Sequence, residues 1–426
     1  MSAPRWVDVA RAANLLGADG TPRATIFAEM SALAAATGSV NLGQGFPDVD
    51  GPESVARVAA DSIRAGVNQY PPGPGIPELR HAIAAHQARR YGLSLDPDSQ
   101  VLVTAGATEA MAATVLALAG PGDEVLTLEP FYDAYAAVIA LAGATHTTAP
   151  LRATPDGFRL DEDALAAAFT SRTRLVVINT PHNPTGAVLT RDELAVVARL
   201  AQQHDALVVT DEVYEHLTLP RPDGVRATHV PIATLPGMAQ RTLTISSAGK
   251  TFSFTGWKIG WVSGPAELLD AVRTVKQFLT YVNGAPFQPA VAFALQDEGV
   301  AAWVDELAVS LARRRDLLSE GLRAAGFAVA RPQGTYFVVA DAAPLGYDDG
   351  VALCRDLPRL CGVVGVPVSA FTRPGSPTDE ALRSWVRFTF VKRDDVLAEA
   401  VGRLARLTTS GPGRSSAQPV QPPPRL

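Results

Sequence analysis

The stretch RLVVINTPHNPTGAVLTRDELAVVARLAQQHDALVVTDEVYEH, residues 174–216, contains one complete strand–helix–strand pattern. Two apolar, β-branched runs, at 174–179 and 206–210, flank a segment whose apolar residues recur at helical spacing. Thr190 and Glu193, at the start of that segment, have the spacing of a helix capping box. Apolar strands joined by a helix are typical of parallel strands that are buried on both faces. The stretch therefore predicts an α/β fold.

The same alternation extends to both sides of this unit. Further short apolar runs lie at 101–104, 124–128, 242–246 and 259–263. Because helical patterns separate most of these runs, we expect one large domain at 48–288. Its core would be a mostly parallel sheet with helices on both faces.

The rest of the chain is predicted to form an arm, a smaller domain and a tail. Residues 1–47 read as an irregular arm that packs with the small domain and holds one short helix at 25–37. A long helical pattern at 300–326, followed by mixed strand and helix patterns, predicts an α+β small domain at 289–409. The segment 410–426 is rich in Pro, Ser and Gly, and we expect it to be disordered.

Composition excludes several classes of protein. The chain has 426 residues, a formal net charge of −6 and no long basic run, which argues against a nucleic-acid partner. Its two cysteines, Cys354 and Cys361, form neither a disulfide framework nor a metal-binding spacing, so no metal is expected. No apolar run reaches the roughly 18 residues of a membrane span, and the N-terminus lacks the features of a signal peptide. We therefore expect a soluble cytoplasmic protein without a membrane partner.

Small or polar residues follow four of the predicted strands. In a parallel sheet the carboxyl ends of the strands meet at one edge, and ligands bind there. The residues that this geometry would gather are Gly106, Asn183, Asp211, Tyr214 and Lys250. Their convergence is a stronger indication of a site than any one of the motifs alone.

The chemistry of these positions is complementary, although each has a structural explanation. AGATEA, residues 105–110, would leave the amides of Ala107 and Thr108 free at a helix N-terminus and so bind a phosphate, or it is an ordinary turn. Ser247 could add a hydroxyl to that site. Lys258 could add a positive charge, or lie exposed at the strand that follows.

Asp211, Tyr214 and Asn183 also allow two interpretations each. Asp211 could hold a heteroaromatic nitrogen protonated, or cap a helix. Tyr214 could donate a hydrogen bond to a ligand, or be a half-buried core tyrosine. Asn183, in HNPTG, could reach a phenolic oxygen and a substrate carboxylate, or simply begin a turn.

Lys250 lies in SSAGKTFSFTGWKIGW, residues 246–261, among small, apolar and aromatic residues. A lysine after a strand is usually a surface residue. A desolvated lysine is instead a nucleophilic amine that can form a Schiff base with an aldehyde. A phosphate cradle, a Schiff-base lysine and an aspartate for a pyridinium nitrogen are together the set that binds pyridoxal 5′-phosphate. We expect that cofactor rather than a set of independent structural coincidences.

The chain resembles the class I/II pyridoxal-phosphate aminotransferases of fold type I over residues 26–407. The matching motifs are NLGQGFPDVDGP, NQYPPGPGIPELR, EPFYDAY, PHNPTG, TDEVYE, SSAGKTFSFTGWKIGW and VRFTFVK. Within the family it is similar to the kynurenine–oxoglutarate/glutamine transaminase branch, and more similar to actinobacterial N-succinyldiaminopimelate aminotransferases. The resemblance implies a homodimer with shared active sites.

The resemblance also implies a role for each matching residue. Lys250 would form the Schiff base and Asp211 would pair with the pyridine nitrogen. Asn183 and Tyr214 would hydrogen-bond the phenolic oxygen of the cofactor, and Tyr132 would stack on its ring. The catalytic residues would thus be Lys250, Asp211 and Tyr214.

The phosphate would be held by Ala107, Thr108, Ser247 and Lys258. Many relatives have arginine where Lys258 stands, and a lysine can still bind phosphate as a point charge. Tyr70, in NQYPPG, matches a tyrosine that reaches the phosphate of the neighbouring subunit.

For the substrate, the resemblance implies that Arg387 binds the α-carboxylate with its fork of donors. Without the family, Arg387 could equally be a solvent-facing strand residue. The backbone of Gly45 and the amide of Asn183 would lie against the same carboxylate. The chain departs from the kynurenine branch at Asn283 and Gly284, where that branch has an aromatic residue and a histidine. This difference favours a longer, more polar substrate.

The expected reaction moves an amino group from an L-amino acid to a 2-oxo acid, with 2-oxoglutarate as acceptor. The expected donor is N-succinyl-L,L-diaminopimelate, in lysine biosynthesis. Lys250, released as a neutral amine, would move the α-proton. The alternatives are a kynurenine, glutamine, aromatic or specialised-metabolism aminotransferase, a cysteine-conjugate β-lyase, and a pyridoxal-phosphate-sensing regulator. The regulator would need a DNA-binding module, which neither the arm nor the tail resembles.

Overall fold

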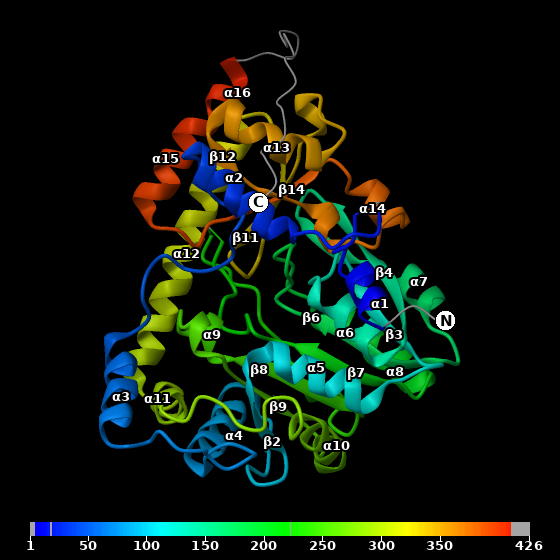
Figure 1. Cartoon of the computed structure of the whole chain (residues 1–426), viewed down its shortest axis with the longest axis vertical. Helices are drawn as coiled ribbons and strands as arrows, with labels where there is room; N and C mark the ends of the chain where they lie inside the picture. The colour runs from blue at the N-terminus through cyan, green and yellow to red at the C-terminus, as the bar shows by residue number, and fades with distance from the viewer. Residues whose placement is uncertain (1–4, 18, 222, 410–426) are drawn as a thin grey trace.

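The computed structural model describes residues 5–17, 19–221 and 223–409. Their largest element is an eight-stranded sheet (Figure 1). In spatial order its strands are β2 (Val101–Ala105), β9 (Ile259–Ser263), β8 (Thr242–Ser247), β7 (Leu207–Asp211), β6 (Thr173–Asn179), β3 (Glu124–Glu129), β4 (Thr145–Thr154) and β5 (Gly157–Leu160). The inner strands β8, β7, β6, β3 and β4 are parallel. The predicted α/β fold with a mostly parallel sheet is confirmed.

Strand β9 runs antiparallel to both of its neighbours, although the sequence alternation indicated another strand of the parallel series. The connection between β8 and β9 consists of residues 248–258. Parallel neighbours need a crossover of about a dozen residues or more, usually a helix, so this short connection reverses the chain. The reversal places residue 258 at the same edge of the sheet as the ends of the parallel strands.

Both faces of the sheet are buried, which explains why its strands are apolar without alternation. In β6, Leu175 and Val177 pack on one face while Val176 and Ile178 pack on the other. The first face is covered by α5, α6 and α10, and the second by α7 and α8. The large-sheet helices are α3 (Glu53–Arg64), α4 (Pro77–Tyr91), α5 (Gly106–Leu118), α6 (Ala134–Ala142), α7 (Glu162–Ala168), α8 (Arg191–Gln203), α9 (Ala248–Thr251), α10 (Ala266–Lys276) and α11 (Phe287–Ala294), with 3-10 turns η1 (Ile232–Thr234) and η2 (Thr255–Trp257).

Local sequence explains where the helices begin and end. Thr190 and Glu193 form the predicted capping box of α8. Pro77 begins α4, and Gly92 ends it in the left-handed conformation. No helix of the described ranges combines the length and apolarity needed to cross a membrane.

A second, antiparallel sheet has the strand order β10 (Ala328–Ala330), β11 (Phe337–Asp341), β14 (Trp385–Thr389) and β13 (Val366–Pro367). Around it lie α12 (Glu298–Ala324), α13 (Gly350–Cys361), α14 (Pro377–Ala381), α15 (Asp394–Leu404), α16 (Arg406–Thr409), η3 (Ala343–Leu345) and η4 (Val368–Phe371). Helix α12 belongs to two cores: Val300 packs beside the large sheet and Leu318 beside the small one. The domain boundaries at 48–288 and 289–409 therefore stay predictions.

The N-terminal arm contacts both parts of the molecule. Its strand β1 (Val40–Asn41) pairs with β12 (Val363–Val364), and its helix α2 (Ile26–Thr37) packs on α13. A further helix, α1 (Arg5–Ala12), lies against α6. We expected one helix in the arm, because eight residues show too little periodicity to indicate a second. The predicted disorder of 410–426 concerns residues outside the described ranges.

Two glycines permit a close approach between β9 and the turn that begins α5. Gly106 has a φ of +73°, which favours glycine. A Cβ on Gly260 would lie 2.5 Å from the carbonyl carbon of Gly106 and 2.7 Å from the amide nitrogen of Ala107. Backbone atoms cannot yield as a flexible side chain can, so this contact fixes the position of the turn.

We expect Gly260→Ala to lower the free energy of unfolding by about 2 kcal/mol, because the added methyl group overpacks a backbone contact. Thermal and denaturant unfolding of the purified protein would measure it. Gly402→Ala in α15 is a matched control: apart from the neighbouring backbone of its own helix, no atom of the described residues lies within 4 Å of a Cβ placed there, and alanine favours a helix. Equal stability losses in the two variants would contradict the prediction.

Candidate active site

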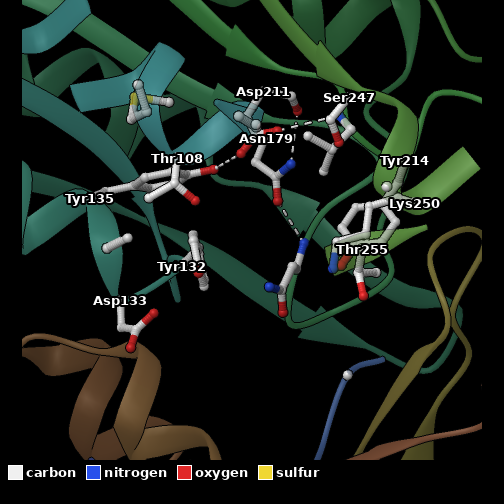
Figure 2. A pocket seen from close by; sticks show the side chains of 18 of the residues that line it. Thr108, Tyr132, Asp133, Tyr135, Asn179, Asp211, Tyr214, Ser247, Lys250 and Thr255 are labelled. Carbon is white, nitrogen blue, oxygen red and sulfur yellow. Dashed lines mark hydrogen bonds between the residues drawn. The ribbon is translucent and has the colours of Figure 1, made fainter. Parts of the chain in front are cut away.

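A cavity of about 390 Å³ lies at the carboxyl ends of the parallel strands (Figure 2). The predicted residues that line it are Gly45, Ala107, Thr108, Tyr132, Asn183, Asp211, Tyr214, Ser247, Lys250, Lys258 and Arg387. Tyr70 does not line it. Its side chain is 81% exposed, and its ring lies edge-on to that of Tyr281, 5.6 Å away. The structure therefore brings together every predicted site residue except Tyr70.

Lys250 stands in α9, the single helical turn that follows β8. Its Nζ lies 6.0 Å from the ring centre of Tyr214 and 5.8 Å from that of Tyr336. The side chain is half-buried rather than fully desolvated, because it lines the open cavity. Lys250 is thus an amine among aromatic rings, with no carboxylate partner among the described residues.

Asp211 ends β7 and is buried. Its Oδ2 accepts a hydrogen bond from the hydroxyl of Tyr135 at 2.6 Å, and its Oδ1 accepts a longer one, at 3.3 Å, from the amide of Val213. Burial raises the pKa of Asp211 above the usual value for an aspartate, while these hydrogen bonds and Lys250 act in the opposite direction. The sequence does not single out Tyr135, because EPFYDAY contains two tyrosines and the family motif points to Tyr132.

Asn179 is a second site residue that the sequence interpretation missed. Its side-chain amide donates to the backbone carbonyl of Asp211 at 2.8 Å and accepts from the backbone amide of Asn183 at 2.7 Å. It therefore joins the ends of β6 and β7. A polar residue closing an apolar strand was the available signal for Asn179.

The turn into α5 forms an electropositive corner of the cavity. Helix α5 begins at Gly106, so the first backbone amides of its first turn point away from the helix. Lys258 places its Nζ 3.4 Å from the hydroxyl oxygen of Thr108. Partial burial and then the charge of Lys250 lower the pKa of Lys258. Ser247, at the end of β8, completes the corner.

Asn283 supports this corner from within its own chain. Its side-chain amide donates to the backbone carbonyls of Thr104 at 3.0 Å and Lys258 at 3.1 Å. The next residue, Gly284, has a φ of +54°, and a Cβ there would lie 2.4 Å from Ile259. These two positions thus brace the turn around residue 258, and neither carries a bulky side chain.

Arg387 lies on β14 and is buried, which excludes the interpretation as a solvent-facing strand residue. Its Nη1 donates to Asn183 Oδ1 at 3.1 Å and its Nη2 to the carbonyl of Gly43 at 2.9 Å. Its Nε has no hydrogen-bond partner among the described residues. The guanidinium carbon lies 4.1 Å from the ring centre of Phe337 and 4.6 Å from that of Phe371. Burial lowers the pKa of Arg387 to about 10, so it remains cationic at neutral pH.

The remaining predicted residues complete the wall between the two sheets. Burial raises the pKa of Tyr132 to about 12, and burial followed by Tyr336 raises that of Tyr214 well above its usual value. Both hydroxyls therefore keep their protons at neutral pH and can donate hydrogen bonds. Tyr336 donates to the carbonyl of Gly45 at 2.7 Å, which holds the arm against the cavity.

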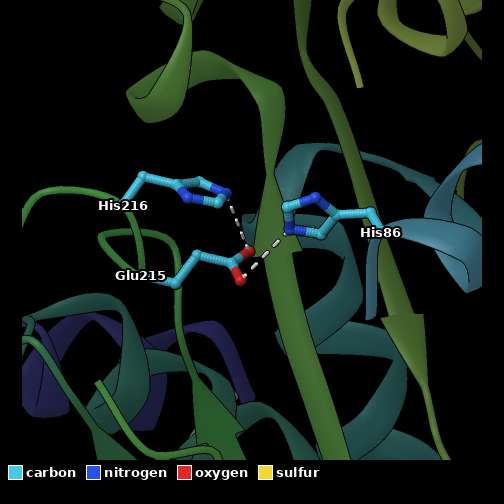
Figure 3. Close-up of side chains that lie close together, drawn as sticks. All are labelled: His86, Glu215 and His216. Carbon is cyan, nitrogen blue, oxygen red and sulfur yellow. Dashed lines mark ion pairs between the residues drawn. The ribbon is translucent and has the colours of Figure 1, made fainter. Parts of the chain in front are cut away.

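A buried polar cluster, His86, Glu215 and His216, lies next to the site (Figure 3). Their ligand-capable atoms are within 4.8 Å of one another, a separation that raises the question of a metal. Arg90 lies 3.2 Å from His216 Nδ1; since an arginine only donates, that nitrogen is the acceptor and Nε2 carries the proton facing Glu215. A protonated Nε2 cannot bind a metal. These contacts favour a hydrogen-bonded network.

This network ties the turn that carries Tyr214 to its neighbours. Glu215 accepts from the hydroxyl of Ser246, on β8, at 2.6 Å and from that of Tyr91, on α4, at 2.6 Å. The carboxylate thereby fixes the end of β7 relative to the end of β8, and so helps to position Tyr214 relative to Lys250.

Comparisons with known proteins were consistent with one family. Residues 37–404 match the model for aminotransferase class I and II. The chain is 56% identical over 387 residues to a Mycobacterium tuberculosis protein named "Probable N-succinyldiaminopimelate aminotransferase", covering 90% of this chain and 96% of that one. It is 37% identical over 398 residues to mouse kynurenine–oxoglutarate transaminase 3, covering 88% and 86%. The solved structure of N-succinyldiaminopimelate aminotransferase from Mycobacterium tuberculosis is similar with a TM-score of 0.87 and 53% identity, covering 96% of this chain and 100% of that one.

The hydrogen bond from Tyr135 favours the ionised form of Asp211, so Tyr135→Phe should raise the pKa of Asp211 further. A carboxyl group whose pKa is higher in the folded state costs stability as the pH rises above its unfolded value. The loss of stability in Tyr135→Phe should therefore be about 2 kcal/mol larger at pH 8 than at pH 4. Urea unfolding of the cofactor-free protein at both pH values would measure it.

Tyr347→Phe is the control for this measurement, because the hydroxyl of Tyr347 makes no hydrogen bond among the described residues. Its effect on stability should not depend on pH in this range. A loss in Tyr135→Phe that is equal at the two pH values would show that the hydroxyl does not act through the ionisation of Asp211.

Proposed function

The chain belongs to the class I and II aminotransferases, and we propose that its amino donor is N-succinyl-L,L-diaminopimelate and its acceptor 2-oxoglutarate. It is a pyridoxal-phosphate-dependent enzyme that moves an amino group between an amino acid and a 2-oxo acid. The observation that supports this choice of amino donor is the 56% identity, over 90% of this chain, to the protein named for that substrate. We further propose the following roles for the residues of the cavity.

The donor set of the cavity fits pyridoxal 5′-phosphate. The amides at the start of α5, with Thr108, Ser247 and Lys258, would hold a phosphate at the positive end of a helix. Asp211 would face the ring nitrogen, and Tyr132 would lie against the ring. When bound, the cofactor supplies an aldehyde that bonds to amines and a protonated ring that accepts negative charge.

Tyr135 and Asn179 would set the position and the charge of the Asp211 side chain opposite that ring. Both hold Asp211 in place, and Tyr135 also favours its charged form. A charged carboxylate opposite the ring nitrogen keeps that nitrogen protonated. Tyr214 and Asn183 would hydrogen-bond the phenolic oxygen.

Arg387 would orient the substrate. The α-carboxylate would bind where Arg387 lines the cavity, with the backbone of Gly45 beside it. The two phenylalanine rings that enclose the guanidinium exclude water from this contact, so the charged hydrogen bonds are strengthened. Lys250 would then remove the proton from the α-carbon of the substrate and return it to C4′ of the cofactor.

We also propose a cytoplasmic homodimer. Large apolar side chains are exposed in two segments, with Ile63, Val67 and Tyr70 in one and Phe278 and Leu279 in the other. Exposed apolar groups that gather on one surface are typical of an interface. Tyr70 and Tyr281 bring the two segments together, and Tyr70 would reach the phosphate site of the partner subunit.

Lys250→Ala should lose the covalent bond to the cofactor and at least about 10³-fold in transamination rate, because it removes both the attaching amine and the proton carrier. Borohydride reduction followed by mass spectrometry would locate the cofactor on the peptide that contains Lys250 in the wild type. Lys258→Ala should keep this attachment and bind the cofactor less tightly. A yellow, reducible adduct at the old position in Lys250→Ala would disprove the assignment.

The donor can be tested by following the half-reaction spectrally with one amino acid at a time. We expect N-succinyl-L,L-diaminopimelate to react faster than kynurenine, aromatic amino acids, glutamine, methionine or guanidino amino acids. Rapid reaction with kynurenine and none with the succinylated compound would overturn the proposed donor. Pyruvate and ammonia formed from a cysteine conjugate without a 2-oxo acid would indicate a β-lyase.

A further inference from the structure

A second cavity, of about 280 Å³, adjoins the first and has no role in the reaction described above. It is lined by the N-terminal arm on one side and by residues 367–379 and α13 on the other. Phe27 and Asp133 line both cavities. A group bound at Arg387 could therefore extend past these two side chains into the second cavity.

Among the described residues that line this cavity, one cation has no carboxylate partner. Arg355 pairs with Glu29 at 2.9 Å, and Asp379 accepts hydrogen bonds from the hydroxyl of Thr372 and from a backbone amide. Arg23 donates to the carbonyl of Asn14 at 2.7 Å and has no carboxylate partner in the described part of the chain. Arg23 is therefore available to an anion in this cavity.

Asp133 stands at the junction of the two cavities. Its side chain is half-buried, and no cationic group among the described residues forms an ion pair with it. Burial raises its pKa above the usual value for an aspartate, while the backbone amide of Ala134 and the charge of Arg387 act in the opposite direction. In Figure 2 it lies beyond Tyr132, away from Asp211 and Lys250. A ligand that passes this point gains by offering an N–H group to Asp133.

We propose that the second cavity is the subsite for the far end of the amino donor, with Asp133 accepting a hydrogen bond from an N–H partway along its side chain and Arg23 binding a terminal carboxylate. This inference rests on the proposed function, because the α-carboxylate must be held at Arg387 for the side chain to reach the junction. An N-acylated amino acid with an anionic acyl group has both features. Succinylated diaminopimelate is one member of that class.

Three donors distinguish the two contacts. N-succinyl-L,L-diaminopimelate has the N–H and the terminal carboxylate, besides a carboxylate on the carbon that bears the N–H. 2-Aminoundecanedioate has a terminal carboxylate at the same chain length but no N–H, and methionine has neither. We expect Arg23→Ala to raise KM about 10-fold for the first two, through loss of a charged hydrogen bond, and less than about twofold for methionine. Arg23→Lys should recover part of the loss, since it restores the charge. Asp133→Ala should raise KM for the succinylated donor only.

Arg199→Ala is the matched control, since Arg199 is an exposed arginine on α8 that contacts Gln203 and lines neither cavity. It should leave all three KM values unchanged. Steady-state kinetics of the holoenzyme with a fixed acceptor would supply the values. An equal rise of KM for all three donors in Arg23→Ala, or no rise for the anionic ones, would overturn the subsite.

The outcome also distinguishes this inference from the proposed donor. If the wild type uses 2-aminoundecanedioate in a manner that depends on Arg23 and rejects the succinylated compound, the proposed donor is wrong and the anion subsite stands. If the succinylated compound is the preferred donor and Arg23→Ala binds it as well as the wild type does, the donor stands and the subsite is wrong. Failure of the wild type to use either anionic donor would overturn both.

Discussion

The site depends on a buried carboxylate at the end of a parallel strand. Asp211 is removed from water by the sheet and its helices, so its charge has to be supported by the few groups that reach it: the Tyr135 hydroxyl and the Val213 amide at its oxygens. Asn179 then fixes its backbone and that of Asn183, which in turn accepts from Arg387. One continuous set of hydrogen bonds therefore links the large sheet to the small one. A ligand that binds between the two sheets would contact residues of both.

Much of this arrangement could be predicted from sequence, because it follows from strand direction. Apolar runs at 174–179 and 206–210 require parallel strands covered on both faces, and parallel strands bring Asn183, Asp211 and Lys250 to one edge. The structure agrees with that convergence. The motif resemblance added residues that no local pattern could place, above all Arg387, which comes from a different sheet.

What could not be predicted depends on contacts between distant segments. The pairing of Tyr135 with Asp211 spans 76 residues, and nothing in EPFYDAY separates it from Tyr132. The half-burial of Lys250 reflects the open cavity and not its apolar neighbours in sequence. The direction of β9 depends on the length of a connection, and the second cavity exists only where the arm meets the small sheet.

The contact between Gly260 and the Gly106–Ala107 backbone has a consequence for redesign of the enzyme. It leaves no room for a side chain at Gly260, so mutational libraries that vary this position would consist mainly of destabilised variants. The arm around Arg23 is exposed and makes few such contacts, and it can accept diverse side chains at little structural cost. Laboratory evolution toward new donors would therefore progress fastest by randomising the arm while keeping the two glycines fixed.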